Sequence, residues 1–247
     1  MWLVWGFVGI CMGSFVGVLA QRLPRGEDVI WSRSHCDHCK KTLAWYELIP
    51  LLSFVLQGGR CRQCSKKFSG KYPVIELATG CLWAVTALFS PATPLELGAN
   101  LLIVSSLFVI FLADMAYQII PDSMLVAASL GVVGKWVGGG VDIGQSVWSG
   151  IGASVFVLFL WIVTRGAGIG LGDVKLVLVM GLLLGFPGIL FALYIAFLTG
   201  AGVGVILILR RKKSLKSKIA FGPFLLLGTA ASIIWREQLL LFWHRLF

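Results

Sequence analysis

The sequence predicts an all-α polytopic membrane protein with about eight transmembrane helices and a polar loop domain between the first two. Of its 247 residues, 58% are hydrophobic and only 13% are charged, which is too apolar for a soluble domain of this length. The apolar residues are gathered in runs of roughly 15 to 22, close to what a helix needs to cross a bilayer core. A soluble all-helical protein is the alternative, and so many long charge-free runs argue against it.

The predicted spans follow one another along the chain, separated by polar loops or by turns rich in Gly and Pro. The first is too long and too aromatic for an ordinary signal peptide, and its Gly9 and Gly13 have the spacing of closely packed helices. The tail, residues 235–247, alternates charge with Trp and Phe and is expected to lie in the membrane interface. The eight ranges are Trp2–Ala20, Pro73–Phe89, Leu97–Ala113, Pro121–Gly140, Val147–Thr164, Val174–Phe186, Ile189–Leu209 and Ile219–Ile234.

The basic residues, which give a net charge of +10, are concentrated in residues 22–71 and 210–218. Such blocks mark cytoplasmic loops and lie against anionic lipid headgroups. A basic patch would also suit nucleic acid, but both blocks adjoin predicted spans, so topology explains them and no nucleic-acid partner is expected. With eight spans, both blocks face the cytoplasm, as do the helix ends that carry Asp114 and Asp173.

These two carboxylates adjoin apolar runs. Asp114 follows the run Leu101–Ala113, and Asp173 lies in Gly170-Leu171-Gly172-Asp173-Val174-Lys175. A carboxylate at a bilayer helix centre costs roughly 2.5–3.5 kcal/mol and less near an end, so it is normally kept only where it is paired, hydrated or used. The glycines beside Asp173 lack a Cβ and let another backbone approach.

Four cysteines in the first loop form two CxxC pairs: Cys36 with Cys39, and Cys61 with Cys64. Two such knuckles can supply the four thiolates of a tetrahedral zinc site. The gap between the pairs, residues 40–60, is slightly longer than usual, and a reducing cytoplasm disfavours disulfides. We expect structural zinc, with free or redox cysteines as the alternative. A closed Cys₄ site leaves no open position for chemistry, so its role would be folding.

Four stretches together resemble the bacterial type IV prepilin peptidases. Their order and spacing agree with that family over nearly the whole chain, and the family's usual Asp is replaced by Glu47, which keeps the charge. The stretches are Ser34–Gly80 with both CxxC pairs, Asp114 followed by Ile120-Pro121-Asp122, Gly170–Lys175, and Phe221-Gly222-Pro223-Phe224.

The resemblance implies a GxGD-type intramembrane aspartic protease of the bacterial inner membrane, with Asp114 and Asp173 as the catalytic pair at the cytoplasmic face. Its substrates would be prepilins and pseudopilins, cleaved after a glycine. Members with the cysteine loop are also held to N-methylate the new N-terminus from S-adenosylmethionine, for which the sequence itself shows no pocket. The supporting motif residues are Gly170, Gly172, Lys175, Gly222 and Pro223.

Peptide hydrolysis by two carboxylates requires one to be protonated and the other ionised, and two acids held close achieve this by sharing a proton. The ionised acid activates water and the protonated acid donates to the carbonyl oxygen. Pro223 has no N–H, so carbonyls near it are free to pair with an unwound substrate. The rival functions are a transporter, in which the acids relay protons or cations, and a non-enzymatic scaffold with the zinc loop as a docking module.

Three other residues have structural interpretations beside a functional one. Asp122 is expected to cap a helix, Lys175 either tunes Asp173 or extends to the lipid face, and Glu76 is expected to be structural rather than part of methyl transfer. The predicted organisation is a first transmembrane helix (1–21), a cytoplasmic Cys₄ zinc loop domain (22–72), a seven-helix peptidase core (73–234) and the interfacial tail (235–247).

Overall fold

The computed structural model describes residues 1–29, 31–36, 38–90, 93–139, 142–166, 168–209 and 220–246. It divides into two compact units, Met1–Val109 and Ile110–Phe247. Within the described residues every element is a helix, apart from two isolated β-bridges, which confirms the all-α class. The second basic block, residues 210–218, and the Gly140 end of the fourth predicted span lie outside the described residues.

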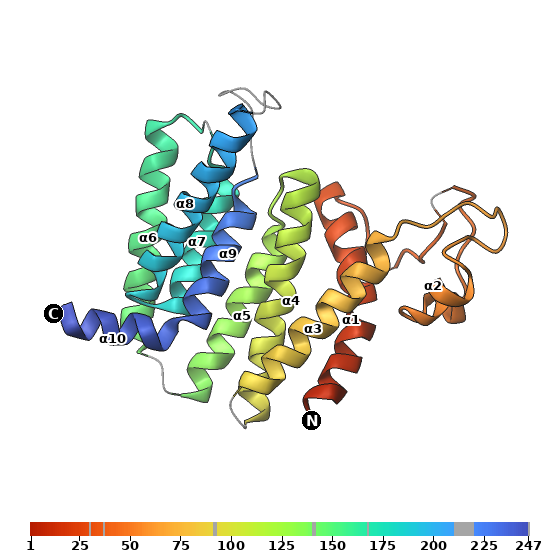
Figure 1. Ribbon diagram of the computed structural model, residues 1–247, viewed down its shortest axis with the longest axis horizontal. Coiled ribbons are helices and arrows are strands. Elements are labelled where there is room, and N and C mark those ends of the chain that lie inside the picture. Colours follow the sequence, from red (N-terminus) through yellow and green to blue (C-terminus); the bar gives the residue numbers. More distant parts are fainter. Residues whose placement is uncertain are drawn as a thin grey trace. The chain divides into compact units, whose positions relative to one another are not determined.

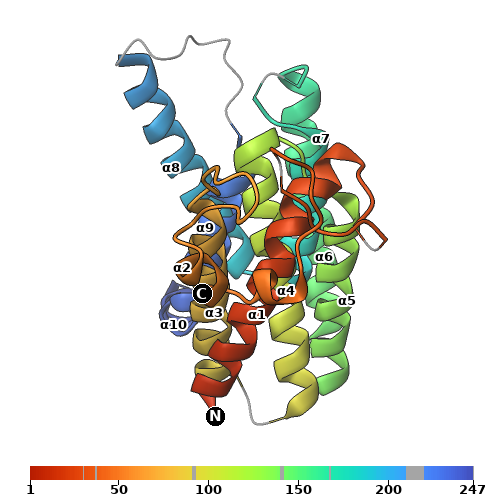
Figure 2. The same ribbon diagram turned by 90° about the vertical axis from the view of Figure 1, so that its right-hand side faces the viewer.

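The first unit is built on α1 (Trp2–Arg22) and α3 (Lys71–Phe89), which cross in close contact (Figures 1 and 2). A Cβ added at Gly9 would lie 2.7 Å from Trp83 Cβ, and one added at Gly13 would lie 2.6 Å from Glu76 Cα. No side chain fits at either glycine, so the close helix packing predicted from their spacing is confirmed, with α3 as the partner.

The polar loop between α1 and α3 contains little regular structure. It carries two 3₁₀ turns, Leu23–Arg25 and Trp45–Leu48, and the short helix α2 (Leu52–Leu56). The same unit also includes the first part of α4 (Pro94–Tyr117), which is attached to α3 by a hydrogen bond from Trp83 Nε1 to Ser105 Oγ of 2.9 Å.

The second unit holds the end of α4 and six further helices. They are α5 (Asp122–Gly138), α6 (Ile143–Val163), α7 (Leu171–Leu184), α8 (Gly188–Leu209), α9 (Gly222–Ile234) and α10 (Arg236–Leu246). Helix α7 packs against α5, α6, α8 and α9 (Figure 1), and beyond Lys175 it is apolar all round, as expected of an enclosed helix. Its 14 residues span about 21 Å, less than the ~30 Å of a bilayer core. At least one end of α7 therefore falls short of the membrane surface.

Five helices in the described part of the chain are long and apolar enough to cross a membrane, and the pair α9 and α10, bent by 74° at their junction, would make a sixth. A helix lies at each of the eight predicted positions, but α5 and α7 have only 17 and 14 residues. The membrane-protein class therefore agrees with the sequence, while the count of eight spans and the interfacial position of the tail stay predictions.

Candidate active site and metal centre

Asp114 lies one turn before the end of α4, inside the second unit. The helix ends where Gln118 adopts a left-handed conformation (φ +55°) and its N–H donates to the Asp114 carbonyl at 2.9 Å. The Asp114 side chain is buried, with 4% of the residue exposed. The Gly222 N–H approaches this carboxylate, but among the described residues no hydrogen bond of normal geometry reaches its Oδ2. A buried carboxylate oxygen left unpaired is costly, which marks this atom as a candidate for contact with a ligand.

Asp173 is the third residue of α7 and is equally buried, with 6% exposed. Its Oδ2 accepts a hydrogen bond of 2.7 Å from the N–H of Gly170, and its own N–H donates to the Gly170 carbonyl at 3.1 Å. The carboxylate satisfies the N–H of the N-cap residue, as the third helical residue does in a capping box, and the second bond runs to the Gly170 carbonyl because glycine has no side chain. The GxGD motif therefore both starts α7 and fixes the orientation of the Asp173 carboxylate.

Both acids lie in the second unit, where the charge of Asp114 acts on Asp173. Gly222, the first residue of α9, adjoins the same place, because a Cβ added there would lie 2.6 Å from Asp114 Oδ2. Gly172 is likewise confined, since an added Cβ would lie 3.1 Å from Ile120 Cβ. The start of α9 therefore lies against the Asp114 carboxylate, and the start of α7 lies against Ile120, in the segment that follows α4.

Asp122 and Lys175 depart from their expected roles. Pro121, not Asp122, occupies the N-cap of α5, and no side chain caps that helix, so the capping prediction is wrong. The Asp122 carboxylate instead pairs with Lys175 of α7, at 2.7 Å between Oδ1 and Nζ. The charge of Lys175 is therefore paired with a residue of α5. Neither role expected from the sequence, tuning Asp173 or extending to the lipid face, included this partner.

The four cysteines of the loop lie together as predicted. The Sγ atoms of Cys36 and Cys64 are 3.9 Å apart, as are those of Cys39 and Cys61, and all four lie within 4.8 Å of one another. Sulfurs bound at about 2.3 Å around a tetrahedral ion are about 3.8 Å apart. The donor set and its spacing therefore fit a single metal ion.

The two CxxC knuckles share one backbone geometry. In each, the residue after the second cysteine is left-handed, Lys40 at φ +58° and Ser65 at φ +54°. The amides of these two residues donate to the carbonyls of Cys36 and Cys61, each at 2.9 Å. The flanking β-bridges pair His35 with Thr42 and Arg60 with Lys67. A repeated knuckle of this kind presents its sulfurs on one side, so two of them form the halves of one site.

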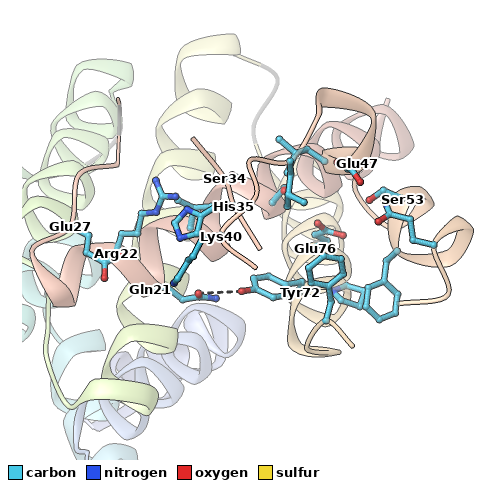
Figure 3. Close-up of a pocket in the computed structure, with 18 of the residues that line it drawn as sticks. Gln21, Arg22, Glu27, Ser34, His35, Lys40, Glu47, Ser53, Tyr72 and Glu76 are labelled. Atoms are coloured by element: carbon cyan, nitrogen blue, oxygen red, sulfur yellow. Dashed lines mark hydrogen bonds between the residues drawn. The ribbon is translucent and has the colours of Figure 1, made fainter. Parts of the chain in front are cut away.

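A cavity of about 240 Å³ lies in the first unit, between the end of α1, the cysteine loop and the start of α3. Figure 3 shows Glu76 and Tyr72 of α3 on one side and Arg22 and Lys40 on the other. Glu76 accepts a hydrogen bond of 2.8 Å from the Leu51 N–H. No local sequence motif indicates this cavity, because its walls come from separate segments of the chain.

Comparisons with known proteins agree with this geometry. Residues 7–89 match the model of the bacterial peptidase A24 N-terminal domain, and residues 101–205 match that of the type IV leader peptidase family. Proteins named prepilin leader peptidase/N-methyltransferase are similar over most of their length. The one from Bacillus subtilis (strain 168) is 29% identical over 96% of each chain. The one from Burkholderia pseudomallei (strain K96243) is 33% identical over 92% of this chain and 82% of its own.

No solved structure shows a significant match. The curated relatives are nevertheless matched across both units, from the cysteine loop to the helices that carry Asp114 and Asp173. The chain therefore belongs to the type IV leader peptidase family.

Proposed function

We propose that this chain is a membrane-embedded aspartic peptidase that removes the short basic leader from type IV prepilins and pseudopilins, with Asp114 and Asp173 as its catalytic pair. The observation that carries the assignment is the presence in one unit of two buried carboxylates, 4% and 6% exposed, with the charge of Asp114 acting on Asp173. A third element, Gly222, brings backbone against Asp114.

The two acids would work on one shared proton. The ionised carboxylate takes a proton from water as the water oxygen bonds to the scissile carbonyl carbon, and the protonated carboxylate donates to the carbonyl oxygen. The tetrahedral intermediate then collapses, the C–N bond breaks, and the leaving nitrogen takes up a proton. Asp173 is held for this work by the Gly170 N–H, and the unpaired Asp114 Oδ2 is left to face water or substrate.

The glycines and Pro223 would serve the substrate backbone. Gly222 leaves space beside Asp114 that any side chain would fill. Pro223, the second residue of α9, has no N–H to donate, so it does not compete for the carbonyls of an unwound peptide. A substrate helix must unwind at the cleavage site, because a helical peptide bond is shielded by its own hydrogen bonds.

We also propose that the chain methylates the new N-terminal amine, the second activity in its relatives' names. In this step the amine lone pair forms the C–N bond, the sulfur of S-adenosylmethionine keeps the electron pair of the broken C–S bond, and the amine releases one proton. We assign this activity to the loop domain, residues 22–72 with the helices beside it, and peptide cleavage to residues 73–234.

The metal we propose for the cysteine site is Zn²⁺, which takes four thiolates in a closed tetrahedron. Cys36, Cys39, Cys61 and Cys64 would hold it, and it would fix the two knuckles relative to each other. We place the loop and the acid pair at the cytoplasmic face of a bacterial inner membrane. The basic loop, residues 22–71, supports this through the positive-inside rule.

The test is to incubate the purified protein with a prepilin and measure the product by mass spectrometry. Loss of the leader would support the peptidase, and a further gain of one methyl group would support the second activity. Asp114→Asn and Asp173→Asn should each stop cleavage while the protein still inserts. Cleavage that survives both substitutions would overturn the assignment. The transporter alternative predicts ion flux in proteoliposomes without any cleaved product, and the comparisons give it no support.

A further inference from the structure

The cavity in the first unit contains a buried polar atom without a partner. Gln57 lines it, just after α2, and among the described residues its Oε1 is buried without any hydrogen bond. A buried acceptor left unpaired costs roughly 1–3 kcal/mol. This cost is recovered if a ligand brings an N–H donor into the cavity.

A buried carboxylate lines the same cavity. Glu76 is only 8% exposed although α3 is otherwise apolar around it. Its Oε2 accepts the N–H of Leu51, which has a left-handed conformation (φ +59°) and precedes α2. Glu76 therefore ties α2 to α3, and its charge faces the cavity that both helices line. The charge is suited to a ligand with a positive centre.

The remaining walls add flat apolar surface and basic groups. Phe54 and Phe68 line the cavity, and Arg22 and Arg25 lie at its α1 end. Arg22 also donates to the carbonyl oxygens of Asp28 and Ser32, so it holds the loop against α1. The cavity thus combines aromatic faces, an unpaired acceptor, a buried carboxylate and arginines, in a space of about 240 Å³.

We propose that this cavity is the binding site for S-adenosylmethionine, with Gln57 accepting from the adenine amino group and Glu76 facing the sulfonium cation. An adenine offers one flat ring for the phenylalanines and one exocyclic amine for Gln57, and the amino-acid end offers a carboxylate to the arginines. The inference rests on the methyl transfer proposed above, and it locates that activity at named residues.

The experiment measures binding of two ligands to the full-length, zinc-loaded protein in detergent by equilibrium dialysis. S-adenosylmethionine carries the sulfonium charge, and S-adenosylhomocysteine has the same adenosine without it. Gln57→Leu removes the acceptor and should weaken both ligands by about tenfold. Glu76→Gln keeps an oxygen for the Leu51 N–H but removes the charge, so it should weaken S-adenosylmethionine by about tenfold while leaving S-adenosylhomocysteine within about twofold.

Two matched substitutions in α10, Gln238→Leu and Glu237→Gln, change the same residue types at exposed positions and should change neither affinity. The zinc content of each variant reports whether the loop still folds. If wild-type protein binds the donor and methylates a cleaved pilin but neither cavity variant alters binding, the cavity assignment is wrong and the proposed function stands. If wild-type protein cleaves a prepilin but neither binds the donor nor methylates, the proposed methyl transfer fails and the inference fails with it.

Discussion

Lys175 Nζ lies 2.7 Å from Asp122 Oδ1, so an ion pair joins the start of α7, two residues after Asp173, to the first turn of α5. The two side chains are 56% and 71% exposed, and exposed pairs contribute only about 0–1 kcal/mol. Their contribution to folding is therefore small. Their position suggests a different role, which is to hold the start of α7 in register with α5.

The pair can be tested by exchanging its charges. Lys175→Met and Asp122→Asn should each lower the rate of leader cleavage by at most roughly fivefold, because the start of α7 loses an anchor while Asp173 keeps its Gly170 contact. The double variant Asp122→Lys with Lys175→Asp should recover part of that loss. The measurement is the single-turnover rate of leader cleavage. If the double variant cleaves no faster than either single variant, the ion pair does not set the register of α7 against α5.

Asp114→Asn and Asp173→Asn should each reduce leader cleavage by roughly 10²–10⁴-fold or more, the usual range for losing a general acid or base. Neither change should destabilise the fold, since an amide fits where the carboxylate was and removes a buried charge. At position 173 the amide oxygen can still accept from the Gly170 N–H. Initial cleavage rates together with thermal unfolding midpoints separate a chemical defect from a folding defect. A loss of rate matched by a loss of folded protein would contradict this account.

The sequence was informative where local chemistry decides the structure. Runs of apolar residues located eight helices, the CxxC spacing located one cluster of four cysteines, and the pattern Gly170–Asp173 placed an acid at a helix start. It was wrong at Asp122, because Pro121 took the N-cap and the true partner, Lys175, lies far along the chain. The cavity was missed for the same reason, since Gln57 and Glu76 come together only through tertiary packing.

Gly222→Ala should reduce cleavage strongly. The added Cβ would lie 2.6 Å from Asp114 Oδ2, so the carboxylate or the start of α9 has to move. A shift of about 1 Å in a reacting group can lower the rate by roughly 10–100-fold. The matched control is Gly202→Ala in α8, where an added Cβ meets nothing within 4 Å. The control should cleave at the wild-type rate, and equal losses in both variants would show that Gly222 has no special relation to Asp114.

Removing the metal should separate the two proposed activities. The cysteine cluster lies in the first unit and the acid pair in the second. Methyl transfer, which we assign to the loop, should therefore depend on the ion more directly than peptide cleavage does. A chelator, or Cys39→Ser, should release zinc, unfold the knuckles and abolish S-adenosylmethionine binding. Leader cleavage should persist within a few-fold.

The measurements are zinc content, donor binding and cleavage on the same sample, followed by restoration of zinc to the chelated protein. Cys11→Ser and Cys81→Ser are the controls, because these exposed cysteines lie in α1 and α3, away from the cluster. They should keep both activities. If cleavage is lost in parallel with zinc, the assignment of the two activities to separate parts of the chain is wrong, because the acid pair would then depend on the loop. Donor binding that survives complete removal of zinc would place the methyl-donor site away from the cavity that the loop helps to enclose.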